Sequence, residues 1–110
     1  MKTPLAADET IVKSGPANLQ RGPETAGGRL CLTSRRLIFE SHAFNARRGE
    51  TEILLSDLAS VANCWTKLFN IFPILENSLA VTTSQGKEHR FVLFGREKWA
   101  AAITSARAIL

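Results

Sequence analysis

The chain has 110 residues, enough for one domain with a single hydrophobic core, and this length excludes a catalytic cleft between two domains. Hydrophobic residues make up 45% of the chain and charged residues 22%, a balance typical of a folded domain and unlike that of a disordered protein. The 14 Lys and Arg residues against 10 Asp and Glu residues give a formal net charge of +4, a mild excess that names no partner by itself.

The N-terminal residues carry no folding signal. Residues 1–9 contain Pro4 and no periodic apolar pattern, so we expect a flexible tail, followed by one domain over residues 10–110. The tail lacks the apolar run of a secretion signal. The longest apolar-rich run, residues 68–75, is too short to cross a bilayer as a helix.

The first strand signal is interrupted. Residues 10–13 and 17–20 are compatible with a strand, but Gly15 and Pro16 lie between them, and a proline cannot donate to a sheet ladder. We therefore expect an edge strand or a bulge. Residues 21–28 hold three glycines and a proline, which predicts a connection.

The central signal is a β-hairpin. Two short apolar runs, residues 30–32 and 37–39, flank a polar and basic corner at residues 33–36. Because side chains alternate across a sheet, the leucines of the first run share one face, as do Leu37 and Phe39 of the second. The sheet therefore has an apolar face that another element must cover.

Two strands follow the hairpin. A polar loop over residues 42–49 precedes a strand at residues 52–56, and a turn at residues 57–60 leads to a strand at residues 61–69.

The C-terminal third combines a second hairpin with a helix. The hairpin joins residues 79–83 to residues 90–94 through a turn in which Gly86 can take a positive φ. From Arg96 onward the apolar residues recur at three- and four-residue steps, which predicts an amphipathic helix of about four turns. Its apolar face holds Trp99, Ala102, Ile103, Ala106 and Leu110. We expect Trp99 to anchor the core.

Motifs in the same order as these elements resemble the GRAM domain, a branch of the pleckstrin-homology-like (PH-like) superfamily. In the central hairpin the matching residues are Gly28, Arg29, Leu30, Leu32, Thr33, Ser34, Arg36, Leu37, Ile38, Phe39 and Ser41. Further matches lie in residues 55–61 and 77–103. The resemblance implies a mainly β domain, a seven-stranded β-sandwich or partly open barrel capped by one C-terminal α-helix.

The resemblance also implies a binding site. In this superfamily, loops at one rim of the barrel take anionic lipid headgroups or peptides, and here we assign to those loops Arg21, Arg29, Arg47, Arg48 and Lys87. We therefore predict a binding module that recognises an anionic membrane surface or lipid, located in the cytoplasm and peripheral to the inner face of a membrane. Each cation near such a surface contributes about 1 kcal/mol.

One departure from the superfamily pattern bears on this reading of the basic residues. The pattern typical of phosphoinositide-binding PH domains is absent, since Cys31 stands where that pattern has an arginine, so no dedicated inositol-phosphate pocket is implied. The alternative for the arginines is a solvated surface balanced by nearby glutamates. We expect Arg36, at the hairpin corner, to face the other end of the barrel and to pair with a nearby carboxylate.

A protein-interaction module is the competing class. It would bind a partner, or a second copy, through an open sheet edge or through the apolar 68–75 loop. The residues predicted for an apolar interface are Trp65, Phe69, Ile71, Phe72 and Ile74. This run is equally compatible with a position under the barrel, and the oligomeric state stays open. The sequence predicts no nucleic-acid partner, because no aromatic platform is interleaved with the arginines.

The sequence carries no catalytic pattern. His42 and His89 have no evident nucleophile or carboxylate constellation, so we predict no enzyme activity. Cys31 and Cys64 lack metal-ligand spacing and are expected to be buried, reduced thiols, which favours the cytoplasm. No metal site and no cofactor are predicted.

Overall fold

The computed structural model describes residues 3–21, 24–42, 51–68 and 72–110; the side chains of residues 21, 24, 63–68 and 72–77 lie outside this description. Within these residues there is no helix of the length and apolar character needed to span a membrane.

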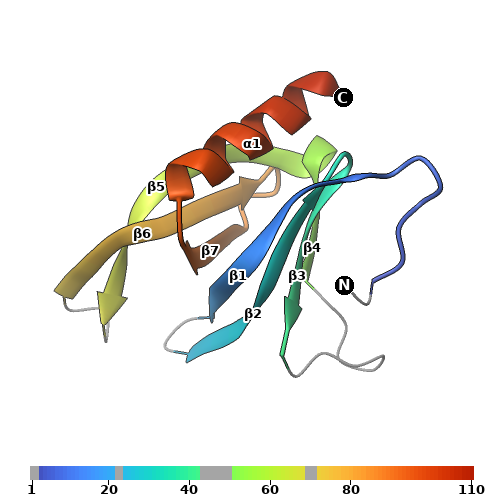
Figure 1. Cartoon of the computed structure of the whole chain (residues 1–110). Helices are drawn as coiled ribbons and strands as arrows, with labels where there is room; N and C mark the ends of the chain where they lie inside the picture. Colours follow the sequence, from blue (N-terminus) through green and yellow to red (C-terminus); the bar gives the residue numbers. More distant parts are fainter. Residues whose placement is uncertain (1–2, 22–23, 43–50, 69–71) are drawn as a thin grey trace.

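Seven antiparallel strands and one C-terminal helix make up the fold (Figure 1). The strands are β1 (Ile11–Arg21), β2 (Glu24–Thr33), β3 (Arg36–Ser41), β4 (Thr51–Leu54), β5 (Leu58–Leu68), β6 (Phe72–Thr83) and β7 (Glu88–Leu93). They form one sheet in the order β4-β3-β2-β1-β7-β6-β5, in which β4 and β5 are the edges and the sheet is not closed. A short 3-10 helix, η1 (Leu55–Asp57), turns the chain from β4 into β5. The predicted mainly β architecture with a C-terminal helix is confirmed.

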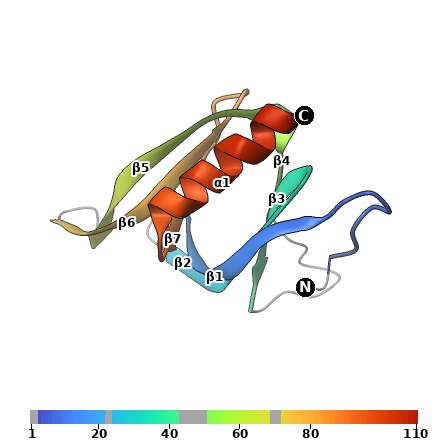
Figure 2. The same cartoon turned by 45° about the horizontal axis from the view of Figure 1, so that its top comes forward.

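The helix covers the concave side of the bent sheet. In Figures 1 and 2, α1 (Arg96–Ile109) lies across the opening between the half formed by β1–β4 and the half formed by β5–β7. Its buried side chains are Trp99, Ile103 and Ala106, the three- and four-residue spacing that the sequence predicts. The inner face of the sheet supplies the rest of the core, including Leu30, Leu32, Leu37, Phe39, Leu79, Val81, Phe91 and Leu93.

Trp99 anchors this contact, as predicted. Its side chain is 3% exposed. The indole lies over Gly15 of β1, where an added Cβ atom would stand 3.7 Å from Cζ2 of the ring. The ammonium group of Lys13 lies 5.2 Å from the ring centroid, a cation–π contact on the solvent side. Gly15 has no side chain and thus leaves room on β1 for the largest side chain of the helix.

Strand boundaries differ from the prediction in several places. β1 is continuous and carries its irregularity between Ile11 and Lys13. Pro16 lies outside the β1–β7 ladder, which pairs only residues 17–20 of β1, and so its missing donor costs nothing there. β2 begins at Glu24 and not at Leu30. Gly27 and Gly28, which suggested a connection, are paired with residues of β1, and these cross-strand contacts overrode the weak strand preference of glycine.

The apolar segment over residues 68–75 is also more regular than predicted. β5 already begins at Leu58, within the segment predicted as a turn, and β6 begins at Phe72, so most of the segment belongs to the β5–β6 hairpin. Pro73 pairs opposite Lys67 at a register shift, a place where the sheet tolerates a missing donor.

The close approach of β2 and β3 at Gly28 makes a first prediction. A Cβ atom at Gly28 would lie 2.2 Å from the Glu40 carbonyl oxygen and 2.7 Å from Cα of Ser41, so Gly28→Ala must push two paired strands apart. We expect a loss of about 1 to 3 kcal/mol in the free energy of unfolding, measured by urea denaturation.

Gly27→Ala is the matched control. The nearest atoms to its added Cβ are on the side chains of Asn18, at 3.1 Å, and His42, at 3.4 Å, which can move. Its cost should stay below about 1 kcal/mol. Equal costs for the two variants would contradict the backbone explanation.

Candidate functional site

The predicted basic residues do not gather in one described pocket. Arg29 lies within β2 and not in a loop, on the face away from the core, and is exposed. Lys87 is exposed in the β6–β7 turn. The backbone of Arg21 ends β1 but its side chain lies outside the description, and Arg47 and Arg48 lie outside the described residues altogether.

Lys87 lines one hollow of the described surface. This hollow, about 510 Å³, lies between edge strand β4 and the β6–β7 turn, and its walls are Thr51, Glu52, Ile53, Leu54, Asp57, Thr83, Gln85, Lys87 and His89. Burial lowers the pKa of His89, and the neighbouring Lys87 lowers it further, so the imidazole is neutral at pH 7. Glu52 and Asp57 oppose the single cation. The described lining of the hollow is therefore polar without a net positive charge.

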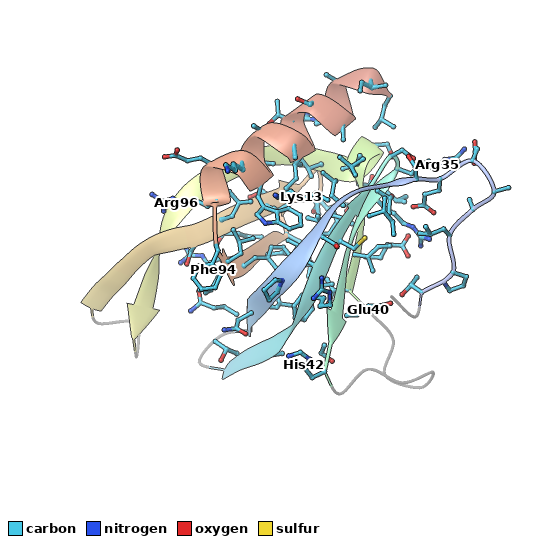
Figure 3. The ribbon with its side chains drawn as sticks, in the orientation of Figure 1. Lys13, Arg35, Glu40, His42, Phe94 and Arg96 are labelled. Atoms are coloured by element: carbon cyan, nitrogen blue, oxygen red, sulfur yellow. The ribbon has the colours of Figure 1, made fainter. Side chains whose placement is uncertain are left out.

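The second hollow, about 310 Å³, has a more apolar wall. It is lined by Pro16, Ala17, Asn18, Gly28, His42, Val92, Leu93 and Phe94. Phe94 stands out because its side chain is 82% exposed directly after β7 (Figure 3). The sequence predicts a strand over residues 90–94, but β7 ends at Leu93 and the side chain of Phe94 is exposed to solvent. An alternating pattern does not show where a strand ends and its last aromatic residue reaches solvent.

The predicted apolar interface cannot be placed in the same way. The side chains of Trp65, Phe72 and Ile74 lie outside the description, and Phe69 and Ile71 lie outside the described residues. Cys31 is buried with a free thiol, as predicted, whereas the side chain of Cys64 is not described.

Residues 3–10, here called the N-terminal strap, run outside the β1–β4 half of the sheet (Figures 1 and 2). The sequence assigns most of this segment to a tail outside the domain. In the structure the Thr3 amide donates a hydrogen bond to Oε2 of Glu40 (2.6 Å), and the Thr3 hydroxyl donates to the same oxygen. At the other end, Thr10 and Ser34 exchange hydrogen bonds of 2.8 and 3.1 Å.

Glu9 of the strap sits in a carboxylate socket at the β2–β3 corner. Its side chain is 1% exposed. Arg36 donates from Nε to Oε2 (2.8 Å) and from Nη2 to Oε1 (3.0 Å), and the Thr33 hydroxyl donates to Oε2 (2.5 Å). The Ala6 amide adds a fourth donor at 3.0 Å. The expectation that Arg36 pairs with a carboxylate is confirmed.

The socket favours the charged form of both partners. The hydrogen bond from Arg36 lowers the pKa of Glu9 to about 2, against the opposing effect of burial, and Thr33 and Ala6 add to the lowering. The same contact raises the pKa of Arg36. Arg36 also donates to Glu52 (3.1 Å) and to the Pro4 carbonyl (2.8 Å), so its guanidinium joins the strap, β3 and β4.

Comparison with known proteins supports the fold alone. The sequence matches no protein-family model and shows no significant similarity to a curated protein sequence. Among solved structures, the C-terminal domain of an unknown protein from Leishmania infantum is similar with a TM-score of 0.72 and 21% identity, over 93% of this chain and 87% of that chain. The Vps36 N-terminal PH domain gives a TM-score of 0.70 at 18% identity, over 96% and 83% of the two chains.

Two further PH structures extend this result. The Slm1 PH domain in complex with phosphoserine gives a TM-score of 0.65 at 16% identity, over 89% of this chain and 96% of that chain. The match to the linker-DH/PH domains of p115-RhoGEF, with a TM-score of 0.72 and 13% identity, covers 96% of this chain but only 31% of that chain. The chain therefore has a PH-like fold, and it corresponds to one part of a larger multidomain protein in the last case.

The carboxylate socket predicts that a substitution of Glu9 by its neutral isostere strongly lowers the free energy of unfolding. Glu9→Gln leaves the guanidinium of Arg36 without its buried partner charge, and we expect a loss of about 3 kcal/mol in the free energy of unfolding at pH 7. Asp8→Asn is the control, because the Arg35–Asp8 ion pair has side chains 51% and 69% exposed. It should cost less than about 1 kcal/mol in the same urea titration.

The low pKa of Glu9 also predicts how stability depends on pH. The pKa is about 2 in the folded protein and 4.5 by ordinary value, so folding favours the ionised carboxylate. This stabilisation is complete above about pH 5 and disappears as the pH falls through 4.5 towards 2. Urea unfolding of the parent and of Glu9→Gln between pH 7 and pH 2 should show the gap between them closing over this window. A constant gap would contradict the assigned pKa.

Proposed function

We propose that this chain is a GRAM-like, non-catalytic binding module that recognises an anionic membrane surface or lipid through basic residues of the PH-like domain. The main support is the ion pairing and solvent exposure of the described Lys and Arg side chains. Arg35, Arg36 and Arg90 form ion pairs with carboxylates, whereas Arg29 and Lys87 are exposed and form no ion pair with any described residue. Lys98 of α1 is also exposed without an ion pair among the described residues, so the two described members of the predicted basic set are among the cations available to an external anion.

The geometry favours attraction to a surface over a deep headgroup pocket. Among the described residues that line its hollow, Lys87 is the only cation, and two carboxylates oppose it. Arg47 and Arg48 precede Thr51, the first residue of that wall, by only three or four positions in the chain. Several cations spread around an opening attract an anionic bilayer additively and without a fixed ligand geometry. The phosphoserine complex of the Slm1 PH domain supports an anionic ligand within this fold.

A protein partner is the second candidate. The β4 and β5 edges of the sheet are not joined to each other, and Phe94 exposes most of its ring beside the 310 Å³ hollow. An exposed aromatic side chain next to a groove is a typical contact for a partner protein. Such a contact would survive high salt, while attraction to an anionic bilayer would weaken.

Liposome sedimentation tests the proposal. The parent, Arg47→Glu/Arg48→Glu and Lys87→Glu are each mixed with neutral phosphatidylcholine vesicles and with vesicles containing phosphatidylserine, at low and at near-physiological salt. We expect pelleting only with the anionic vesicles, weaker at the higher salt, and reduced roughly fivefold for each cation removed. Lys98→Glu, which makes the same charge change at an exposed position of α1, is the matched control for Lys87→Glu and should retain binding.

Two results would contradict the proposal. Parent protein that stays in solution with every vesicle rules out membrane recognition by this chain. An equal loss in Lys98→Glu and Lys87→Glu assigns the binding to net charge and not to the basic loops.

A further inference from the structure

The outer face of the β2–β3 hairpin is buried without belonging to the core. Cys31 and Ile38 pair opposite each other and are 4% and 0% exposed, yet neither is part of the inner core cluster. Because Leu30 and Leu32 point inward, Cys31 must point outward, and Ile38 shares its face. These two apolar side chains therefore need a cover on the side away from α1.

The N-terminal strap supplies that cover. The outward-facing side chains of β2 and β3 form a row along the hairpin, and the strap is bonded to both ends of this row. Thr3 bonds to Glu40 at one end, and Glu9 bonds to Thr33 and Arg36 at the other. Cys31 and Ile38 lie between these two anchors. The charges of Glu40 and Glu9 also help burial to raise the pKa of the Cys31 thiol, which is consistent with the strap lying close above it.

A turn within the strap shortens it to the distance between its two points of attachment on the hairpin. Arg36 and Glu40 are four residues apart on β3, a distance of about 13 Å along a strand. Thr3 and Glu9 are six residues apart, and six extended residues would span about 20 Å. The Glu9 amide donates to the Ala6 carbonyl at 3.1 Å, and this turn shortens the segment to the spacing that the row requires.

The strap is attached mainly by polar contacts. Its residues form no strand of the sheet, and Pro4, Ala6, Ala7 and Asp8 are exposed. Its departure would break no rung of the sheet ladder, because the β2–β3 pairing runs from Gly28 to Leu32 without it. Its contacts include the carboxylate in its socket, the Thr3–Glu40 contact and the exchange between Thr10 and Ser34. The hydrogen bond from Arg36 to the Pro4 carbonyl and the exposed Arg35–Asp8 ion pair add to them.

We propose that the outer face of the β2–β3 hairpin is a peptide-binding surface that selects a segment carrying a glutamate for Arg36 and Thr33, and that residues 3–10 occupy it in cis. An acidic peptide of a partner protein would replace the strap by placing its carboxylate in the same socket and a Ser or Thr hydroxyl near Glu40. Apolar Cys31 and Ile38 would lie under its middle. The strap competes at the high effective concentration of a tethered ligand, so the surface opens to a partner only when the strap detaches.

The first test uses the parent chain. Alkylation of Cys31 is followed against urea concentration, and mass spectrometry of proteolytic fragments separates it from Cys64. A detachable strap predicts that Cys31 reacts by a local opening, with a weaker urea dependence than global unfolding and at urea concentrations where the protein is still folded. Reaction of Cys31 only in step with global unfolding would overturn the proposal.

The second test measures binding in trans. A fluorescent peptide with the sequence of residues 2–12 is titrated into the full chain as parent, Glu9→Gln and Asp8→Asn, and fluorescence anisotropy gives the Kd. Glu9→Gln weakens the cis competitor and should bind the peptide roughly tenfold more tightly than the parent, while Asp8→Asn should match the parent. A peptide with glutamine at the Glu9 position should not bind.

The opposite results are equally clear. Failure of folded Glu9→Gln to bind the peptide, or equal binding of the Glu and Gln peptides, would show that the socket does not select a carboxylate. Circular dichroism establishes that the variant is folded. Should it not fold, the Cys31 measurement on the parent decides the matter alone.

Discussion

The β2–β3 hairpin is buried on both of its faces, and each face needs a different cover. Inward, its leucines and Phe39 meet Phe91 of β7 and the apolar stripe of α1, with the rings of Phe39 and Phe91 5.9 Å apart. Outward, Cys31 and Ile38 are buried between the two places where the N-terminal strap is bonded to the hairpin, at Glu40 and at Thr33. Strand pairing alone satisfies the backbone of the hairpin but cannot remove apolar side chains from water. The helix and the strap are therefore both required by the same alternating sequence.

The ion pair of Glu9 and Arg36 makes the outer cover possible. A carboxylate that is almost fully buried loses its hydration, and an isolated one would be strongly destabilising. Here four donors surround its two oxygens, from Arg36, Thr33 and the Ala6 amide, so the charge is compensated by hydrogen bonds. Because Arg36 also reaches Glu52 on β4, the socket links the strap to the edge of the sheet. The Glu9–Arg36 contact is strong but confined to one end of the strap, which is compatible with detachment of the strap from the folded domain.

The two proposed surfaces differ in their physical chemistry. Recognition of an anionic bilayer by Arg29, Lys87 and the neighbouring basic residues is long-ranged, additive and sensitive to salt. The socket instead selects one carboxylate by directional hydrogen bonds inside a site that excludes water. They need not exclude each other, because Arg36, which serves the socket, is already paired and is not among the cations left for a membrane.

The sequence by itself determined the C-terminal helix, the apolar face of the central hairpin and the existence of most strands, but not all of their boundaries. Alternation at residues 30–39 and the helical spacing of Trp99, Ile103 and Ala106 are local signals, and local signals survive into the fold because each element buries its own apolar face. Only the tertiary structure decided that Glu9 meets Arg36, 27 residues away, that Arg29 lies within a strand, and that Phe94 reaches solvent. Contacts between charged side chains far apart in the chain produce no periodic pattern in the sequence. They depend on where folding brings two polar groups together in space, not on the positions of those groups in the sequence.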